Sequence, residues 1–338
     1  MPSCHPVARR VGMKTAGGAY NSAEATQAGT SGLTGSRHDG SGAHGFARAV
    51  AACLMAAEAY VTPQEARARL ALLAAGEEGD LDLARAALYL AAEEYPALDA
   101  DAYVARLDAM ARDVADLPLE TAPPLGRLLA LNRYLFAEQG FTGNAYHYYD
   151  PRNSFLNEVI DRHTGIPITL SVVYLEVGWR LELPLAGVGM PGHFLVGYYP
   201  EGGARYVDVF AQGRLLTRDD CVARLHEQFG SGFVFRDEHL APVSKRQILT
   251  RMLTNLKQIY LQRQDLDRAL AAVERILLLT PDQPGEVRDR GLIQYRRGAL
   301  RAAHADLERY TQLAPDAPDA ETVRRQMALV WNLWASRN

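Results

Sequence analysis

Gly165-Ile-Pro-Ile-Thr-Leu-Ser171 is the stretch that decides the fold, because a Gly-Ile-Pro break leads directly into a helical pattern. The apolar residues that follow recur at intervals of three and four, the period of one helix face. They are Leu170, Val173, Tyr174, Val177 and Leu181. We therefore predict a helix over 169–181. Few of its positions are polar, so it is expected in the core rather than at the surface.

Three strand candidates follow this helix, over 185–190, 193–199 and 205–210. They are rich in β-branched and aromatic residues, and Glu201-Gly202-Gly203 supplies a turn between the last two. The strands are therefore expected to pair antiparallel. A helix followed by an antiparallel sheet, rather than helices alternating with parallel strands, predicts an α+β domain.

A hydroxyl, an imidazole and a carboxylate occur in this order along the same stretch. Thr169 and Ser171 stand near the start of the helix, and His193 opens the second strand candidate. Asp208 lies near the end of the third, so antiparallel pairing brings it beside His193. The carboxylate can then orient the imidazole, and the imidazole can activate a hydroxyl at the helix N-terminus. Alternatively, Thr169 or Ser171 only caps the helix, a position that favours both side chains.

The layout resembles the transglutaminase-like fold, whose papain-like triad runs Cys, His, Asp along the chain. The finer resemblance is to the SirB family of transglutaminase-like bacterial proteins. The motifs that carry it are Gly140-Phe-Thr-Gly-Asn144, Tyr149-Asp-Pro-Arg-Asn-Ser154, Gly165-Ile-Pro-Ile-Thr-Leu-Ser171, Pro191-Gly-His-Phe194 and the strand ending at Asp208. The resemblance covers roughly residues 60–315 and implies a cysteine-protease-like core followed by tetratricopeptide repeats. It implies no settled activity.

The chain departs from the broader fold at the nucleophile. Where the resemblance places the triad cysteine, the chain reads Ile168-Thr169-Leu170-Ser171, and Cys53 and Cys221 lie far away in sequence. Thr169 is the first candidate for the equivalent position and Ser171 the second. SirB-like sequences tend to carry Ser or Thr here, so the departure is one that the resemblance itself implies.

Four further residues are candidates for lining a substrate cleft: Asn144, Tyr149, Asn153 and Asn157. The amides of Asn153 and Asn157 can donate to an oxyanion, or they can cap and end a short helix expected over 153–162. Tyr149 belongs to an aromatic cluster with Tyr146 and Tyr148, which serves either packing or ligand contact.

Helical sequence flanks this stretch on both sides. Amphipathic patterns predict helices over 62–76, 81–94, 99–117 and 125–138, and the acidic pair Glu93-Glu94 is predicted to lie on a solvated surface. Near the other end, Val273–Pro281 aligns with Leu307–Pro315, a period of about 34 residues that is the tetratricopeptide signature. A final amphipathic helix over 320–334 is expected to cap the repeats.

Three regions are therefore expected. Residues 1–55 are rich in Gly, Ser and Ala and are predicted to be disordered. Residues 56–240 are predicted to form a transglutaminase-like domain of the SirB type, with a helical N-terminal region and a small antiparallel sheet. Residues 245–338 are predicted to form all-α tetratricopeptide repeats.

Composition excludes several function classes. The net charge is −4 with no basic stripe, so no nucleic-acid partner is expected. No run of about 18 apolar residues predicts a membrane span. Three scattered cysteines suit a reducing cytoplasm and no disulfide framework. The spacing of His147, Asp150 and His163 matches no ligand set, so no metal is expected, and no cofactor is expected either.

Two function classes remain. In the first, a transglutaminase-like domain without the usual cysteine binds a protein or peptide segment, with help from the repeats, and acts as a binding or regulatory protein. In the second, Thr169 or Ser171 attacks an amide carbonyl, His193 moves the proton and Asp208 holds His193, as in an amide hydrolase or acyl transferase. A hydroxyl within hydrogen-bond reach of the His193 ring favours the enzyme, and a buried hydroxyl that faces elsewhere favours binding.

Overall fold

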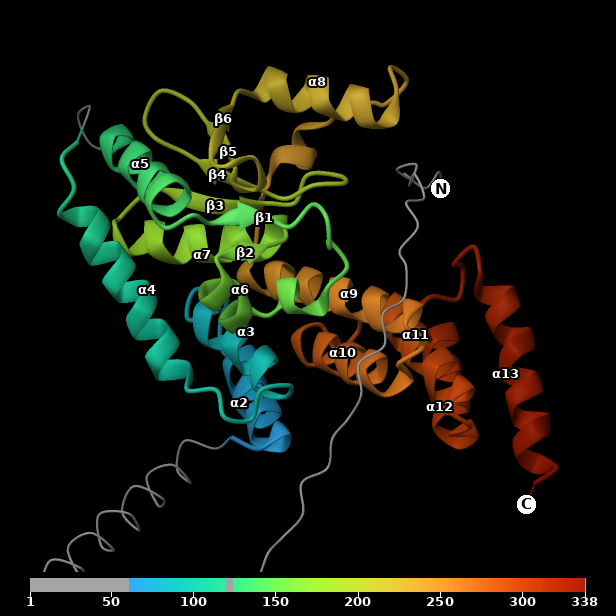
Figure 1. The fold of residues 1–338 in the computed structure, drawn as a ribbon. Helices are drawn as coiled ribbons and strands as arrows, with labels where there is room; N and C mark the ends of the chain where they lie inside the picture. Colours follow the sequence, from blue (N-terminus) through green and yellow to red (C-terminus); the bar gives the residue numbers. More distant parts are fainter. Residues whose placement is uncertain (1–60, 120–123, 338) are drawn as a thin grey trace, which may run out of the picture. The chain divides into compact units, whose positions relative to one another are not determined.

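The computed structural model describes residues 61–119 and 124–337, and Figure 1 shows how their helices and strands are arranged. The segment 1–55 that was expected to be disordered lies outside the described residues. Within the described part, no helix combines the length and the apolar character needed to cross a membrane.

Among the described residues, four helices precede the central stretch. They are α2 (Pro63–Ala75), α3 (Leu83–Ala92), α4 (Ala100–Ala115) and α5 (Leu125–Asn132), and α5 runs on as a π-helical turn, η1 (Arg133–Glu138). Thr62 and Glu65 form a capping box at the start of α2: the Thr62 hydroxyl accepts from the Glu65 amide, and the Glu65 carboxylate accepts from the Thr62 amide. Asp82 and Asp99 cap the next two helices in the same way with their carboxylates.

The core helix is α7 (Pro167–Arg180), whose residues from Pro167 to Gly178 are all buried. It begins two residues earlier than expected. The segment predicted as one helix over 153–162 is instead a 3₁₀ turn, η2 (Pro151–Ser154), followed by α6 (Leu156–Arg162). Asp150 caps the turn by accepting from the Arg152 amide, which is the role that the sequence suggested for an asparagine.

The antiparallel sheet is present and larger than predicted. Its strand order is β6-β5-β4-β3-β7, with β3 (Leu185–Val188), β4 (Leu195–Tyr198), β5 (Arg205–Asp208), β6 (Arg214–Leu216) and β7 (Pro242–Val243). Val196 of β4 pairs with Val207 of β5, so the start of β4 lies beside the end of β5. Two-residue strands β1 (Thr142–Gly143) and β2 (Thr164–Gly165) form a separate parallel pair that the sequence did not predict.

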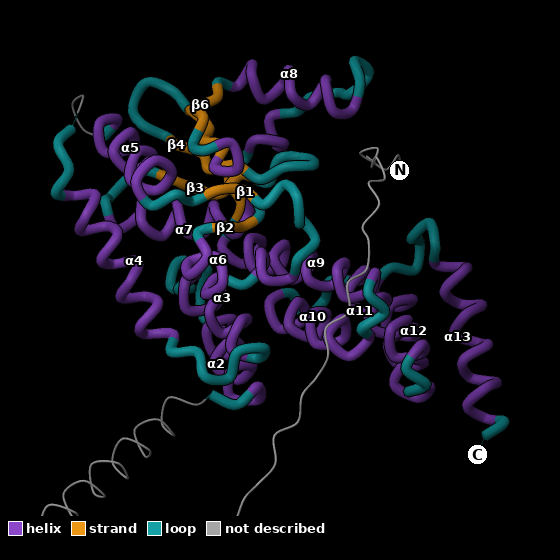
Figure 2. Tube along the Cα trace, in the orientation of Figure 1, coloured by secondary structure: helices purple, strands orange, loops and turns teal. Residues whose placement is uncertain are grey.

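Helices cover both faces of the sheet (Figure 1). One face of the sheet belongs to the main core, which contains α7. The sheet contributes Val196 of β4 and Val207 of β5 to this core. On the other, α8 (Arg218–Phe229) buries Cys221 and Leu225 against Val188, Leu195 and Tyr206. This layering, with the strands gathered at one place among the helices (Figure 2), is the α+β architecture predicted from the sequence.

The repeats form five helices: α9 (Lys245–Gln262), α10 (Leu266–Leu279), α11 (Pro284–Arg296), α12 (Leu300–Leu313) and α13 (Ala320–Ala335). Small residues lie at the crossings; at Gly291 of α11, for example, an added Cβ would approach Leu307 of α12 to 3.1 Å. The pairing of α9 with α10 and of α11 with α12 is the arrangement that the repeat period predicted.

The sequence predicted that the acidic pair Glu93-Glu94 lies on a solvated surface. In the structure the pair instead joins the end of α3 to the repeats. Glu93 is 8% exposed and pairs with Arg67 of α2 at 2.9 Å, and its other oxygen lies 3.7 Å from the buried Arg275 of α10. Glu94 pairs with Arg268 at 2.9 Å. The prediction was wrong because the partner arginines come from a segment far along the chain, which a local helical pattern does not reveal.

Candidate functional site

His193 and Asp208 meet at one end of the sheet. His193 lies just before β4 and Asp208 ends β5, and the Nε2 atom of His193 is 3.0 Å from Oδ1 of Asp208. Gly192 has φ +72°, and an added Cβ would overlap the Gln228 side chain, so the turn that presents His193 requires glycine. The His193 side chain is 10% exposed and that of Asp208 1% exposed.

Asp208 is held ionised by the groups around it. Its Oδ1 also accepts from the amides of Phe210 at 3.1 Å and Ala211 at 3.2 Å, and its Oδ2 accepts from Arg224 of α8. Burial by itself raises the pKa of Asp208, but the hydrogen bonds and charges of His193 and Arg224 outweigh it and lower the pKa to about 2. The sequence did not identify Arg224, because an exposed arginine on a polar helix carries no signal of its partner.

The two candidate hydroxyls do not contact His193. The Thr169 hydroxyl donates to the main-chain oxygen of Asn153 at 2.6 Å and accepts from the Ile166 amide at 3.2 Å. The Ser171 hydroxyl donates to the Pro167 oxygen one turn earlier, at 2.8 Å. Both residues are fully buried. Neither is the N-cap, since α7 begins at Pro167 with Ile166 as its cap. Gly165 leaves room for this packing, because a Cβ there would lie 2.9 Å from the Thr169 oxygen.

A small cavity faces His193 instead. It has a volume of about 30 Å³, and we call it the His193 pocket. The start of α7 contributes Pro167 and Ile168 to its wall, and α9 contributes Arg251 and Asn255. The remaining wall is formed by Tyr148, Gly192, His193 and Phe194. The α7 residues that share this pocket with His193 are therefore Pro167 and Ile168, whose side chains carry no nucleophile.

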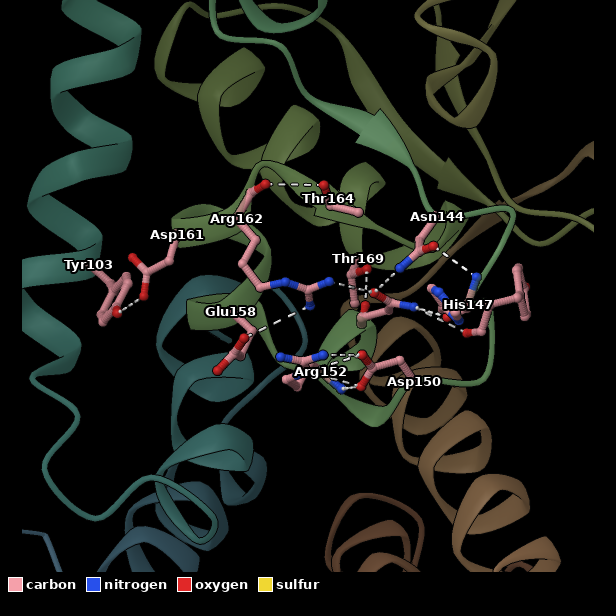
Figure 3. Close-up of polar contacts among 12 residues, drawn as sticks. Tyr103, Asn144, His147, Asp150, Arg152, Glu158, Asp161, Arg162, Thr164 and Thr169 are labelled. Atoms are coloured by element: carbon pink, nitrogen blue, oxygen red, sulfur yellow. Dashed lines mark hydrogen bonds and ion pairs between the residues drawn. The ribbon is translucent and has the colours of Figure 1, made fainter. Parts of the chain in front are cut away.

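Asn153 organises the chain segment 144–150, which we call the tyrosine loop. It is fully buried, and its Nδ2 donates to the main-chain oxygens of His147 at 2.8 Å and Tyr148 at 3.3 Å. Its Oδ1 accepts from Asn144 at 3.1 Å, and Asn144 in turn accepts from the His147 amide at 3.0 Å. Figure 3 shows Asn144, His147 and Thr169 around this network. The sequence offered Asn144 and Asn153 as residues that line a cleft. In the structure their side chains bond to each other and to the tyrosine loop, and so support it.

Asn157 lies on α6 and is 5% exposed, and its Oδ1 has no hydrogen-bond partner among the described residues. The buried hydroxyl of Ser154 is likewise without a partner in that part of the chain. His163 lies apart from His147 and Asp150: its Nδ1 is 2.5 Å from the Gln139 oxygen, and its ring stacks on Phe141. These three residues are therefore not brought together as a ligand set.

The tyrosine loop borders an open groove of about 660 Å³, which we call the outer groove. Tyr146 is 96% exposed and Tyr149 61% exposed, and both line it. Arg263, which follows α9, also lines the groove. It donates to the main-chain oxygen of Tyr149 at 3.2 Å. The groove is therefore built jointly by the core and the first repeat. Tyr148 lines both the outer groove and the His193 pocket, so the two sites adjoin.

Arg251 is the second residue that the sequence did not identify. It donates from Nη2 to the His193 main-chain oxygen at 2.7 Å, and its guanidinium lies 5.3 Å from the Phe194 ring centroid. Arg251 and Asn255 are four positions apart on α9, next to the buried Ile248 and Met252. Two polar residues one helical turn apart, beside the apolar face of α9, are the sequence pattern that could have pointed to this side of the pocket.

The arrangement supports binding more directly than hydrolysis. It provides an oriented imidazole, several hydrogen-bond donors and an exposed aromatic surface. The hydroxyls of Thr169 and Ser171 bond to main-chain groups and not to the imidazole, as nucleophilic catalysis by either would need.

Comparison with known proteins agrees with the two-part architecture. Residues 101–254 match the model of the transglutaminase-like superfamily, and residues 256–328 match a tetratricopeptide-repeat model. No solved structure matches the chain.

Named relatives cover most of the chain. A UPF0162 protein of Xylella fastidiosa (strain 9a5c) is 40% identical over 263 residues, which is 75% of this chain and 91% of that protein. A UPF0162 protein of Vibrio cholerae serotype O1 is 31% identical, over 60% of this chain and 74% of that protein. F-box only protein 21 of Homo sapiens is 29% identical over 46% of this chain, but this is 25% of its own length. The chain, a transglutaminase-like domain followed by tetratricopeptide repeats, belongs to the UPF0162 family.

Proposed function

We propose that this protein binds a segment of another protein in the outer groove, and that the transglutaminase-like domain works without a nucleophile. The observation that carries this proposal is the bonding of Thr169: its hydroxyl donates to the Asn153 oxygen at 2.6 Å, and it thereby supports the tyrosine loop. The residue in the first candidate position for attack thus contributes to a binding surface.

The composition of the outer groove supports a peptide ligand. Exposed tyrosines provide large contact area with few rotatable bonds, and they are enriched at protein interfaces. Tyr146, Tyr148 and Tyr149 lie together on a loop that Asn153 fixes from inside. The groove therefore needs little ordering when it binds, which favours affinity. Tetratricopeptide repeats fit the same role, since such stacks present surfaces to protein segments.

The ion pairs between α3 and α10 support a fixed groove. Arg275 is 1% exposed and donates to the Leu90 oxygen at 2.8 Å, and Arg67 bridges Glu93 and Glu274. These contacts hold the first repeat against the core. Arg263 is therefore held opposite the tyrosine loop, and the two walls of the groove keep their spacing.

The second candidate is an amide hydrolase or acyl transferase, and the 3.0 Å His193–Asp208 contact favours it. In this mechanism Thr169 or Ser171 would release its main-chain acceptor, turn toward His193 and attack a carbonyl carbon. His193 would take the hydroxyl proton and return it to the amine as the C–N bond breaks, and Asp208 would hold the imidazole; water or an acceptor amine would then take the acyl group from the hydroxyl. A fluorophosphonate probe tests this mechanism: labelling that disappears in His193→Ala supports the enzyme, and absence of His193-dependent labelling supports binding.

Three finer assignments belong to the same proposal. The motifs around Gly165–Ser171 and Pro191–Phe194 support a SirB-type domain within the UPF0162 family. We place the domain boundaries at 56–240 and 245–338, with 1–55 as a separate segment, and the protein in the cytoplasm. Within the site, Asn144 and Asn153 are assigned to support, Tyr149 to contact with the ligand, and Asn157, whose Oδ1 is free of partners in the described chain, to the cleft wall.

Selection from a displayed library of random peptides tests the proposed function. The full chain is immobilised, and the Tyr149→Ala variant serves for counter-selection. We expect peptides that are enriched on the wild type and lost on the variant. Enrichment of no peptide, or of peptides that bind both proteins equally, would overturn the proposal.

A further inference from the structure

The polar groups that line the His193 pocket are hydrogen-bond donors or can act as donors. Arg251 contributes a guanidinium, Asn255 an amide and Tyr148 a hydroxyl. His193 contributes Nδ1, since its Nε2 faces Asp208; this second nitrogen donates only when both ring nitrogens carry a proton. No aspartate or glutamate lines the pocket. Such a wall suits a ligand atom that accepts hydrogen bonds.

Arg251 is the strongest sign of a missing anion. Within the described chain it has no carboxylate within ion-pair distance, although most other buried or half-buried arginines of the repeats have one. Arg251 is half-buried, and its partners are the neutral main-chain oxygen of His193 and the Phe194 ring; burial lowers its pKa accordingly. An anion in the pocket would compensate the charge that these neutral partners leave.

The start of α7 adds to the same field. Pro167 has no amide hydrogen, and Ile168 follows it at the wall of the pocket. The first amides of a helix lack acceptors within the helix, and their partial positive charge favours an anion nearby. Arg251 and the helix start therefore both favour a negatively charged ligand, and His193 does so when both of its ring nitrogens carry a proton.

The size of the pocket limits the ligand. A volume of about 30 Å³ exceeds the ~10–15 Å³ that one water molecule needs in a cavity, so the pocket has room for a small group such as a carboxylate but not for a whole residue. Tyr148 lines both the pocket and the outer groove, so the two spaces share this side chain as a wall, and the groove, at about 660 Å³, has room for a chain segment. An acidic side chain can reach from a segment in the groove into the pocket. A chain terminus would also need space at the pocket for its own residue.

We propose that the His193 pocket binds the side-chain carboxylate of an aspartate or glutamate in the protein segment that occupies the outer groove. This inference rests on the proposed function. It adds that the bound segment carries an acidic residue, next to residues that pack on the tyrosines of the outer groove.

Propionate, which reproduces the tip of a glutamate side chain, is the probe. It is titrated into the full chain up to about 100 mM, because a single buried carboxylate contact gives affinities in the millimolar range. The readout is the NMR signal of the His193 imidazole, identified by its loss in His193→Gln. We expect a saturable shift with propionate and none with propionamide, which has the same shape without the charge.

Variants of α9 test the assignment to Arg251. Arg251→Gln is expected to weaken propionate binding about tenfold or more, and Arg251→Lys to restore part of it, since a charge-assisted bond is lost and regained. Arg246→Gln is the matched control, because Arg246 lies on the same helix and donates to Gly76 instead. If Arg251→Gln does not fold, Asn255→Leu provides the second test within the pocket.

Several results would overturn the proposal. They are no saturable shift with propionate, an equal shift in Arg251→Gln, and tighter binding of inorganic phosphate than of propionate. A peptide with an acidic side chain and an amidated end should bind better than its glutamine counterpart with a free terminal carboxylate; the reverse order overturns the side-chain assignment. If propionate fails while Tyr149-dependent peptides are still selected, the pocket assignment falls and the proposed function stands.

Discussion

The hydroxyl of Thr169 donates to the main-chain oxygen of Asn153 at 2.6 Å, so the first candidate nucleophile bonds the residue that supports the tyrosine loop. Ile168, the residue before Thr169, instead lines the pocket that His193 also lines. Two neighbouring residues of one short motif therefore have different roles. Thr169 supports the tyrosine loop, and Ile168 forms part of the wall of the His193 pocket.

Introduced cysteines should distinguish these two positions. In a Cys4→Ser, Cys53→Ser background, Ile168→Cys is expected to react slowly with iodoacetamide, because the position is 2% exposed but lines the His193 pocket and becomes accessible when that pocket opens. Thr169→Cys is expected to stay unreactive in the folded protein, since that site is fully buried. The remaining Cys221 is buried, and burial raises its thiol pKa to about 11, so it should not contribute. Faster reaction at position 169 than at 168, measured by mass spectrometry, would contradict this assignment.

Asn153→Ala should loosen the tyrosine loop. The substitution removes the donor to the His147 and Tyr148 oxygens and leaves buried groups without partners, so we expect a loss of about 1–3 kcal/mol in the free energy of unfolding. Hydrogen exchange should accelerate over 144–150. Asn332→Ala on α13, which lies outside the loop, is the control. Unchanged exchange in the loop of Asn153→Ala would show that Asn153 does not support it.

Acid should weaken the His193–Asp208 site. The pKa of Asp208 is about 2 in the folded protein and about 3.9 in an unfolded chain, so its contribution to stability is complete above the unfolded value and disappears as the pH falls toward 2. A shift of this size corresponds to a contribution on the order of 2 kcal/mol. The difference in unfolding free energy between the wild type and Asp208→Asn should therefore shrink from about pH 5 to about pH 2. A difference that stays constant over this range would exclude the assigned ionisation.

The interface between α3 and the repeats should depend on Glu93 much more than on Glu94. Glu93→Gln removes the carboxylate near the buried Arg275, and we expect a loss of about 3 kcal/mol in the free energy of unfolding. Glu94→Gln is the matched control: its partner Arg268 has a side chain 53% exposed, so the loss should be below about 1 kcal/mol. Denaturant unfolding measures both. Equal losses would mean that burial of Arg275 does not set the strength of this contact.

Local pattern predicted the elements but not the partners that distant segments provide. The hairpin between 193 and 208 is short, and strand pairing alone brings His193 to Asp208. Helix α7 was likewise readable from its apolar period. Arg224 and Arg251 reach the site from α8 and α9, and nothing in their own neighbourhoods indicates which carboxylate or pocket they meet.

The asparagines show a second limit of the sequence. The sequence suggested that Asn153 lines a cleft or caps a helix. In the structure its side chain is buried and donates to the main chain of the tyrosine loop. A residue type that serves caps, clefts and loop supports equally well cannot be assigned without its neighbours. Residues Pro167 and Ile168 were overlooked because a search for nucleophiles passes over apolar side chains.

The most direct test of the central claim is the dissociation constant of a peptide selected on the wild-type chain, measured by fluorescence anisotropy. Tyr149→Ala should weaken binding about tenfold or more, since an exposed aromatic anchor of the outer groove is removed. Leu72→Ala, which removes a 75% exposed apolar side chain on α2, should leave the constant unchanged. Equal affinity of wild type and Tyr149→Ala, together with His193-dependent labelling by a fluorophosphonate, would contradict the binding role and favour the hydrolase.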